Sequence, residues 1–209
     1  MALNYGPSVV TDGLILALDA ADKNSYPGTG TSMYDLSGNN YTFTLQGNAT
    51  FSNEGRGSIY LDGSTDGIQK TSTAGLQSAV TLVQWLKTSD TVGLMLSGEV
   101  VGSTGAYYVG AYYPGQGFYQ NNCGTPSYSV DTKSISNPAS PINYLDNNFH
   151  MWEAKNLNFS SWTTTWNFLG YAASYEIAGY VGVILMYNRI LSAKESEQNY
   201  NSLKSRFGI

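Results

Sequence analysis

The sequence is poor in residues that mark several large functional classes. It has 209 residues with one cysteine, one histidine and 12% charged residues, and its net charge is −5. The single Cys123 excludes an internal disulfide framework, and the single His150 excludes a metal site built from two histidines. No cluster of Lys and Arg is present, which argues against nucleic-acid binding through phosphates.

Long apolar runs are also missing. No stretch approaches the roughly 20 apolar residues that a membrane-spanning helix needs, so the sequence predicts no membrane insertion. The N-terminus, MALNYGPSVV, has no positive residue and no apolar core of the signal-peptide type. Export through the Sec pathway is therefore not indicated.

Glycine and tyrosine are abundant, with 23 Gly and 17 Tyr beside many Ser, Thr and Asn. This composition is typical of short strands joined by tight turns. We expect strands at residues 14–19, 41–45, 49–51, 58–61, 80–87, 92–97, 107–113, 149–157 and 162–169. Residues 80–87 and 92–97 are expected as a hairpin, 149–157 and 162–169 as another strand pair, and 114–147 as a loop-rich region. No repeat or linker divides the chain, so we predict an N-terminal arm at 1–12 and one β domain at 13–209.

The end of the chain gives the clearest local signals. Residues 180–187 are apolar on both faces, which is typical of a strand that is covered on both sides. Simple alternation places Val181, Val183, Leu185 and Tyr187 on one face and Tyr180, Ile184 and Met186 on the other. Ser192 and Glu195 form an S-x-x-E capping box. A helix should follow, with one face made by Ser196, Tyr200, Leu203 and Phe207.

Short motifs follow one another in a fixed order along the chain. They are GLILALDAA at 13–21, NSYPG at 24–28, YDLSGN at 34–39, GSIYLDGSTDGI at 57–68, AVTLVQWLK at 79–87, FH at 149–150 and YNRILSAKE at 187–195. This series, which leaves out about residues 98–146, resembles the concanavalin A-like lectin/glucanase superfamily, and within it the LamG-like jelly-roll group. The resemblance implies an all-β, two-sheet antiparallel jelly-roll sandwich with a short C-terminal helix. Residues 7–14, PSVVTDGL, resemble LamG-type structural proteins of tailed bacteriophages.

The carboxylates do not form the pattern that glycoside hydrolysis needs, which is an acid and a base or nucleophile at a fixed separation. In the glucanase branch of the resembled superfamily they follow an E-x-D-x-x-E pattern on one strand. None of the six Glu residues, at 54, 99, 153, 176, 195 and 197, has a carboxylate at both offsets. Ser-His-Asp chemistry would need His150, which beside Phe149 and Met151 is better explained as packed or hydrogen-bonded. We therefore predict no enzymatic activity.

Calcium is the one cofactor for which the sequence offers a place. Asp62 and Asp66 flank a glycine turn, and hard cations bind several carboxylate and carbonyl oxygens. Some proteins of the resembled family bind calcium in comparable loops. The alternative is an Asx-type turn, in which both carboxylates accept local backbone N–H groups. We favour the turn and expect no cofactor, and we expect Asp19 and Asp35 to act in their own turns.

A tyrosine-rich stretch is the most distinctive candidate site. Its residues are Tyr107, Tyr108, Tyr112, Tyr113, Tyr119, Asn121, Asn122 and Tyr128. Aromatic rings cover the C–H faces of sugars and amides bind their hydroxyls, but the same mixture also makes protein-binding surfaces. A third interpretation is that alternate tyrosines pack in the sandwich. The four Trp residues are expected mostly in the core, with one of Trp162 and Trp166 at the surface.

These observations favour a non-enzymatic structural protein of a bacteriophage virion, either a capsid-decoration or a fibre-type subunit. The expected partners are other virion proteins, a second copy of the chain and a host-surface glycan. The expected location is the virion, assembled in the host cytoplasm. The alternatives are a carbohydrate-binding lectin module and a glycan hydrolase, because the implied fold carries all three functions.

Overall fold

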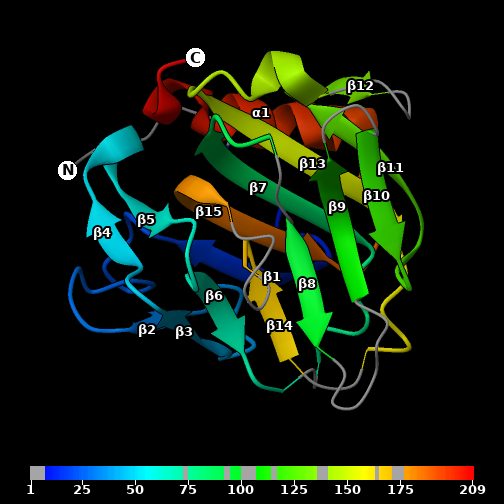
Figure 1. Ribbon diagram of the computed structural model, residues 1–209. Helices are drawn as coiled ribbons and strands as arrows, with labels where there is room; N and C mark the ends of the chain where they lie inside the picture. The colour runs from blue at the N-terminus through cyan, green and yellow to red at the C-terminus, as the bar shows by residue number, and fades with distance from the viewer. Residues whose placement is uncertain are drawn as a thin grey trace.

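The structure, a computed structural model, describes residues 8–72, 75–91, 95–99, 107–113, 117–135, 141–162, 165–170 and 177–209. Within these ranges, the side chains of residues 99, 107, 108, 111–113, 117–119, 141 and 142 lie outside the description. The strands form two antiparallel sheets that pack face to face (Figure 1). We call them sheet A and sheet B.

Sheet A has eight strands in the order β12 (Lys133–Ile135), β11 (Gly124–Val130), β13 (Phe149–Leu157), β7 (Thr81–Thr88), β15 (Ala178–Tyr187), β5 (Ser58–Asp62) and β4 (Thr50–Ser52), with β1 (Leu14–Asp19) paired to β15. Sheet B has seven strands in the order β10 (Gly117–Asn121), β9 (Tyr107–Tyr113), β8 (Leu96–Glu99), β14 (Thr165–Phe168), β6 (Gly67–Lys70), β3 (Thr42–Gln46) and β2 (Ser32–Tyr34). The helical elements are η1 (Glu54–Arg56), η2 (Pro141–Tyr144) and α1 (Ala193–Phe207). The predicted jelly-roll sandwich with a C-terminal helix is confirmed.

The main core fills the space between the two sheets. Its largest buried side chains include Phe43, Phe168 and Trp166, which are at 0% exposure. Trp162 is also buried, because it folds against Trp166 with ring centroids 5.0 Å apart. The expectation that one of these two tryptophans lies at the surface is therefore wrong. Trp162 precedes β14 instead of belonging to it, so strand alternation does not govern its direction.

A second core lies between α1 and the outer face of sheet A (Figure 1). Phe207, at the end of α1, is 7% exposed and packs on Trp85 and Phe149. The helix begins as predicted, because Ser192 and Glu195 form both bonds of the capping box. It ends at Gly208, whose left-handed φ of 82° lets its N–H return to a carbonyl of the last turn.

β15 changes face at Gly182, which corrects the predicted alternation. The residues on the α1 side are Tyr180, Val183, Leu185 and Tyr187, and those in the main core are Val181, Ile184 and Met186. The register against β7 shifts between Val181 and Val183, so one extra residue forms a β-bulge. A Cβ atom at Gly182 would lie 2.5 Å from the ring of Phe207. The helix ring therefore occupies the space that a side chain would need.

The described part of the predicted arm, residues 8–12, lies against the C-terminal part of the same chain. Val10 is 6% exposed, and its N–H donates to Asn199 Oδ1 at 2.8 Å. The Tyr187 hydroxyl donates to the Val10 carbonyl at 3.0 Å. Asp12 forms an ion pair with Arg189 at 2.8 Å. Residues 1–7 lie outside the described residues, and the division into arm and domain stays a prediction.

Several predicted strand assignments need correction. The predicted loop region 114–147 contains β10, β11 and β12. The predicted hairpin of 80–87 with 92–97 is wrong, because β7 lies in sheet A and β8 in sheet B, and residues 92–94 lie outside the description. β13 and β14 likewise lie in different sheets and do not pair. The short strands β2 and β6 were not predicted from the sequence.

Two aspartates fix turns, as predicted. Asp35 accepts hydrogen bonds from the N–H groups of Ser37 and Ala17, both at 2.9 Å, so it ties its own turn to β1. Asp19 accepts from the Ala21 N–H at 2.8 Å. It also pairs with Arg206 of α1 at 2.7 Å. Both side chains therefore stabilise the fold through these hydrogen bonds and the ion pair.

Candidate functional site

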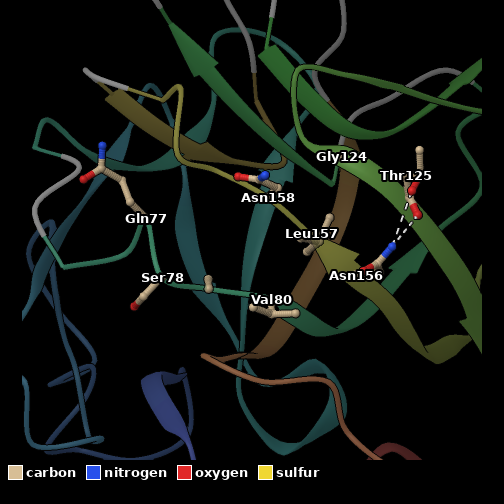
Figure 2. A pocket seen from close by; sticks show the side chains of 9 residues that line it. Gln77, Ser78, Val80, Gly124, Thr125, Asn156, Leu157 and Asn158 are labelled. Carbon is tan, nitrogen blue, oxygen red and sulfur yellow. Dashed lines mark hydrogen bonds between the residues drawn. The ribbon is translucent and has the colours of Figure 1, made fainter.

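A hollow of about 520 Å³ lies at the rim of the sandwich, where β7 and β11 begin and β13 ends (Figure 2). We call it the rim hollow. Its lining residues are Gln77, Ser78, Ala79, Val80, Gly124, Thr125, Asn156, Leu157 and Asn158. Ala79 and Leu157 are buried and give it an apolar floor, whereas the five side chains with hydroxyl or amide groups are exposed. None of these nine described residues carries a carboxylate, imidazole, thiol or amine.

Backbone hydrogen bonds hold three separate segments together around the rim hollow. The Leu157 N–H donates to the Val80 carbonyl at 3.0 Å, which joins the end of β13 to the approach to β7. The Asn158 N–H donates to the Cys123 carbonyl at 2.8 Å, which adds the start of β11. The hollow is therefore built on the ends of paired strands and not on one free loop.

Two amide side chains of the rim hollow are each fixed at one end. Gln77 Nε2 donates to the Trp162 carbonyl at 2.5 Å. Asn158 Oδ1 accepts from the Ser160 N–H at 3.0 Å. The other ends, Gln77 Oε1 and Asn158 Nδ2, have no hydrogen-bond partner within the described part of the chain. One free acceptor and one free donor are thus held in place beside the apolar floor.

A third amide is fixed in the same way. Asn156 Nδ2 donates to the carbonyl and Oγ1 of Thr125, at 3.1 and 3.4 Å, and Figure 2 shows the two side chains turned toward each other. Asn156 has a φ of 62°, a left-handed conformation that Asn tolerates better than most residues. Its Oδ1 is without a partner among the described residues. Together the three amides form a preorganised set of two acceptors and one donor.

The predicted residues Asn121 and Asn122 lie next to the rim hollow in the chain, separated from Gly124 and Thr125 by Cys123. The Asn122 carbonyl accepts from Trp162 Nε1 at 2.7 Å, so its backbone is fixed on the tryptophan core. Cys123, which falls in the region predicted to be loop-rich, is at 0% exposure, and burial raises the pKa of its thiol to about 12.

Tyr128 packs inside the sandwich, as the third interpretation of the tyrosine-rich stretch predicts. It is 6% exposed, and its hydroxyl accepts from the Gly110 N–H at 3.3 Å. Burial raises the pKa of this hydroxyl. The other predicted tyrosines occupy the paired strands β9 and β10, where Phe118 stands opposite Tyr112 and Asn121 opposite Tyr108. The side chains of Tyr107, Tyr108, Tyr112, Tyr113 and Tyr119 lie outside the description.

The loop of Asp62 and Asp66 is closed by backbone hydrogen bonds. Asp66 is 3% exposed, and its two carboxylate oxygens accept from the N–H groups of Asn48 and Asp62 at 2.6 and 2.7 Å. Asp62 Oδ1 accepts from the Ser64 N–H at 2.8 Å. No group of three or more His, Cys, Asp and Glu that could hold a metal is found in the described ranges. The geometry is that of the Asx-type turn.

His150 is hydrogen-bonded on both sides. Its Nδ1 lies 2.6 Å from Asp131 Oδ2, its Nε2 lies 3.1 Å from Asp146 Oδ1, and Tyr144 packs edge-on against the ring. Burial lowers the pKa of His150, but the hydrogen bonds and charges of the two aspartates outweigh it and raise the pKa above its usual value. The imidazole therefore ties the β11–β12 turn to the segment before β13. No Ser or Cys side chain completes a triad with it among the described contacts.

The side chains of the rim hollow were not predicted as a site from the sequence. Asn156 and Asn158 are visible as polar residues at the end of a predicted strand, but Gln77 is about 80 positions away in the sequence. Thr125 falls in the region predicted to be loop. The signal that would find the site is the pairing of β11, β13 and β7, which depends on tertiary structure.

No family model and no curated protein sequence matches this chain. Solved structures with the same fold do match. Trypanosoma rangeli sialidase in complex with the inhibitor DANA has a TM-score of 0.57 and 14% identity, over 96% of this chain and 34% of the sialidase chain. The chain thus spans about a third of the sialidase's length.

Two further structures resemble the chain over more of their own length. Domain 4 of AbnA, a GH43 extracellular arabinanase from Geobacillus stearothermophilus, in complex with arabinotriose, has a TM-score of 0.53 and 11% identity, over 90% of this chain and 98% of that domain. The binding domain of botulinum neurotoxin DC in complex with rat synaptotagmin II has a TM-score of 0.51 and 13% identity, over 93% of this chain and 52% of that one. These likenesses establish the fold.

Within the described residues, no helix has the length and apolar character to cross a membrane.

Proposed function

We propose that this chain is a non-catalytic carbohydrate-binding module and that the rim hollow binds a neutral oligosaccharide. The observation that carries the proposal is the set of three amides, each fixed at one end and free at the other. Side chains that are already held lose little conformational entropy when a ligand binds, so each new hydrogen bond contributes more to affinity.

The chemistry of the lining favours a saccharide over other ligands. Vicinal hydroxyls are both donors and acceptors, which suits the free Oδ1 of Asn156 and the free Nδ2 of Asn158. The apolar floor of Ala79 and Leu157 suits the C–H faces of a sugar ring. No charge lines the hollow, so an ionic ligand would be desolvated without compensation. With no acid or base in the lining, binding without cleavage is the expected outcome.

The structural comparisons support the proposal in one respect. Domain 4 of AbnA, whose similarity to this chain extends over 98% of the domain, was solved with arabinotriose bound. A whole domain of similar topology therefore holds a short neutral oligosaccharide in that protein. We infer that this chain has a comparable role, within the LamG-like group of the concanavalin A-like superfamily.

A glycan array followed by isothermal titration calorimetry tests the proposal. We expect saturable binding of a neutral oligosaccharide by the wild-type chain. Asn158→Ala and Asn156→Ala should each weaken it about three- to tenfold, the usual effect of one neutral hydrogen bond. Asn24→Ala, an exposed asparagine far from the hollow in sequence, serves as the matched control and should bind as the wild type does. Binding that none of these variants changes would refute the site.

A virion role is the second candidate, and the resemblance of residues 7–14 to LamG-type phage structural proteins favours it. In this account the module is a capsid-decoration or fibre-type subunit that adheres to a host-surface glycan. Residues 8–12 already contact α1 and β15 of the same chain, so attachment to another virion protein is assigned to residues 1–7 and to the Tyr107–Tyr128 region. Deleting residues 2–7 should lower assembly onto particles and leave the melting temperature unchanged. Unaltered assembly would argue against this role of the arm.

A further inference from the structure

A row of side chains crosses the outer face of sheet A at the edge formed by β4. The register places Thr50 of β4 opposite Tyr60 of β5, Tyr60 opposite Tyr180 of β15, and Tyr180 opposite Lys87 of β7. The adjacent positions of β5, β15 and β7 belong to the main core: Ile59, Val181 and Leu86. Strand alternation therefore directs the row outward. We call Thr50, Tyr60 and Tyr180 the outer row.

The outer row is only partly covered. Phe207, the last residue of α1, packs on Phe149, which stands opposite Lys87. On the other side of Lys87 the two tyrosines are half-buried, and Thr50 is exposed. β4 is the last strand of sheet A within the described part of the chain, so the row opens at the edge of the sandwich (Figure 1).

The two tyrosine rings are held by each other and by Lys87. The centroids of Tyr60 and Tyr180 are 5.1 Å apart, and the ring planes are inclined by 45°. The Lys87 ammonium lies 5.4 Å from the centre of the Tyr180 ring and forms an ion pair with Glu54 at 2.7 Å. A cation over an aromatic ring is attracted to it. Rings that are already fixed lose little conformational entropy when a ligand binds.

The free polar groups of the outer row are hydroxyls. The hydroxyls of Thr50, Tyr60 and Tyr180 make no hydrogen bond to any part of the chain that the structure describes. Each can donate one hydrogen bond and accept others, which suits the hydroxyls of a sugar. The ion pair of Lys87 and Glu54 at the end of the row has no net charge, so it favours a neutral ligand over an ionic one.

The aromatic rings restrict the kind of sugar further. A tyrosine ring is an apolar body with a polar tip, so it packs on C–H groups and leaves its hydroxyl for hydrogen bonds. A pyranose ring with equatorial hydroxyls presents C–H groups on its faces. An axial hydroxyl would instead point at the aromatic ring and lose its water without compensation.

We propose that the outer row is a second saccharide-binding surface, which binds pyranose residues with equatorial hydroxyls. The rings of Tyr60 and Tyr180 contact the C–H groups, and the hydroxyl of Thr50 binds a sugar hydroxyl. The inference rests on the proposed function for the class of ligand, but it uses no residue of the rim hollow. A polysaccharide that reaches both sites would bind more tightly than a short oligosaccharide, because its second binding event is intramolecular.

A ¹⁵N NMR titration with cellohexaose, a neutral chain of glucopyranose residues with equatorial hydroxyls, tests the inference. The backbone amides of Thr50 and Tyr180 should shift in a saturable way and give the dissociation constant. Tyr60→Leu removes the ring and should weaken this binding about three- to tenfold. Tyr60→Phe keeps the ring and should retain most of the affinity. Tyr34→Leu, which changes a tyrosine of β2 that is 44% exposed, is the matched control and should bind as the wild type does.

Parallel melting curves show that each variant is folded at the temperature of the titration. The inference is overturned if the Thr50 and Tyr180 amides do not respond to cellohexaose, or if Tyr60→Leu binds it as the wild type does. It is also overturned, in favour of a second copy of the chain on this face, if the wild type dimerises in sedimentation velocity and Tyr60→Leu does not.

Asn158→Ala separates the outer row from the rim hollow. The Thr50 and Tyr180 amides of this variant should respond to cellohexaose as those of the wild type do, which supports the inference. Loss of their response in Asn158→Ala would overturn it, because the sugar would then depend on the rim hollow. If the outer row binds cellohexaose and no neutral oligosaccharide shifts the rim-hollow amides, the inference stands and only the proposed binding site at the rim fails.

Discussion

The ring of Phe207 stacks on the indole of Trp85 with centroids 4.7 Å apart and an interplanar angle of 15°. Phe207 is the last residue of α1, and Trp85 lies in the middle of β7. The contact therefore fastens the end of the chain to the centre of sheet A. The bulge at Gly182 makes room for the same ring.

Phe207→Ala should strongly destabilise the fold. Large-to-small changes of a buried phenylalanine cost about 3–5 kcal/mol, and here the change also exposes Trp85. Urea unfolding should show a lower midpoint with little change in slope. Ile209→Ala, two residues further on and 40% exposed, should change the free energy of unfolding by less than about 0.5 kcal/mol. Equal effects of the two variants would show that α1 contributes little to stability.

His150 should make stability depend on pH. Its folded-state pKa is raised by Asp131 and Asp146, so its contribution is complete below the unfolded value of about 6.5 and is lost as pH rises through the higher folded value. The free energy of unfolding should therefore fall as the pH rises from the unfolded value through the folded value, and the contribution of His150 should be insensitive to pH below that range. His150→Gln should flatten that part of the profile. A variant with the wild-type slope would contradict the assignment.

The features of the fold that depend only on residues close together in the sequence were predicted correctly. The capping box needs only Ser192 and Glu195 at the right spacing, and it is present. The face change in β15 was not predictable. The bulge at Gly182 accommodates the ring of Phe207, a residue 25 positions away in the sequence. β11 was missed because its Gly, Ser and Pro residues have low strand propensity, and pairing with β13 overrides it.

The candidate site was predictable only in part. The amide-rich character near Asn121 and Asn122 was visible in composition. The rim hollow needs Gln77, Thr125 and Asn158 to meet, and only the strand pairing of sheet A brings them together. Sequence spacing carries no information about that convergence.

Asp66→Ala should destabilise the chain with or without calcium. The change leaves the N–H groups of Asn48 and Asp62 without acceptors, at a cost of about 1–3 kcal/mol for each group that stays buried. Adding calcium or EDTA should not move the melting temperature of the wild type, since a bound ion would raise it with concentration. A calcium-dependent rise that disappears in Asp66→Ala would establish a calcium site instead.

No glycosidase activity is expected. Glu153, a carboxylate on β13, is 2% exposed and is held by Lys155 at 3.1 Å and by Ser196 at 2.8 Å, so it ties sheet A to α1. A screen against β-glucans, agars and host-type polysaccharides should release no reducing ends. Glu153→Gln should lower the melting temperature and change no turnover. Turnover in the wild type that Glu153→Gln or Glu99→Gln abolishes would overturn this prediction.

The most direct test of the account is a ¹⁵N NMR titration with the neutral oligosaccharide that ranks first on the array. The account predicts saturable shifts of the Asn158 and Asn156 side-chain amide signals and of the backbone amides of Ser78, Val80 and Thr125. The Asn24 side-chain signal should not move. Shifts confined to other parts of the chain, or no shifts at millimolar ligand, would contradict carbohydrate binding at the rim hollow.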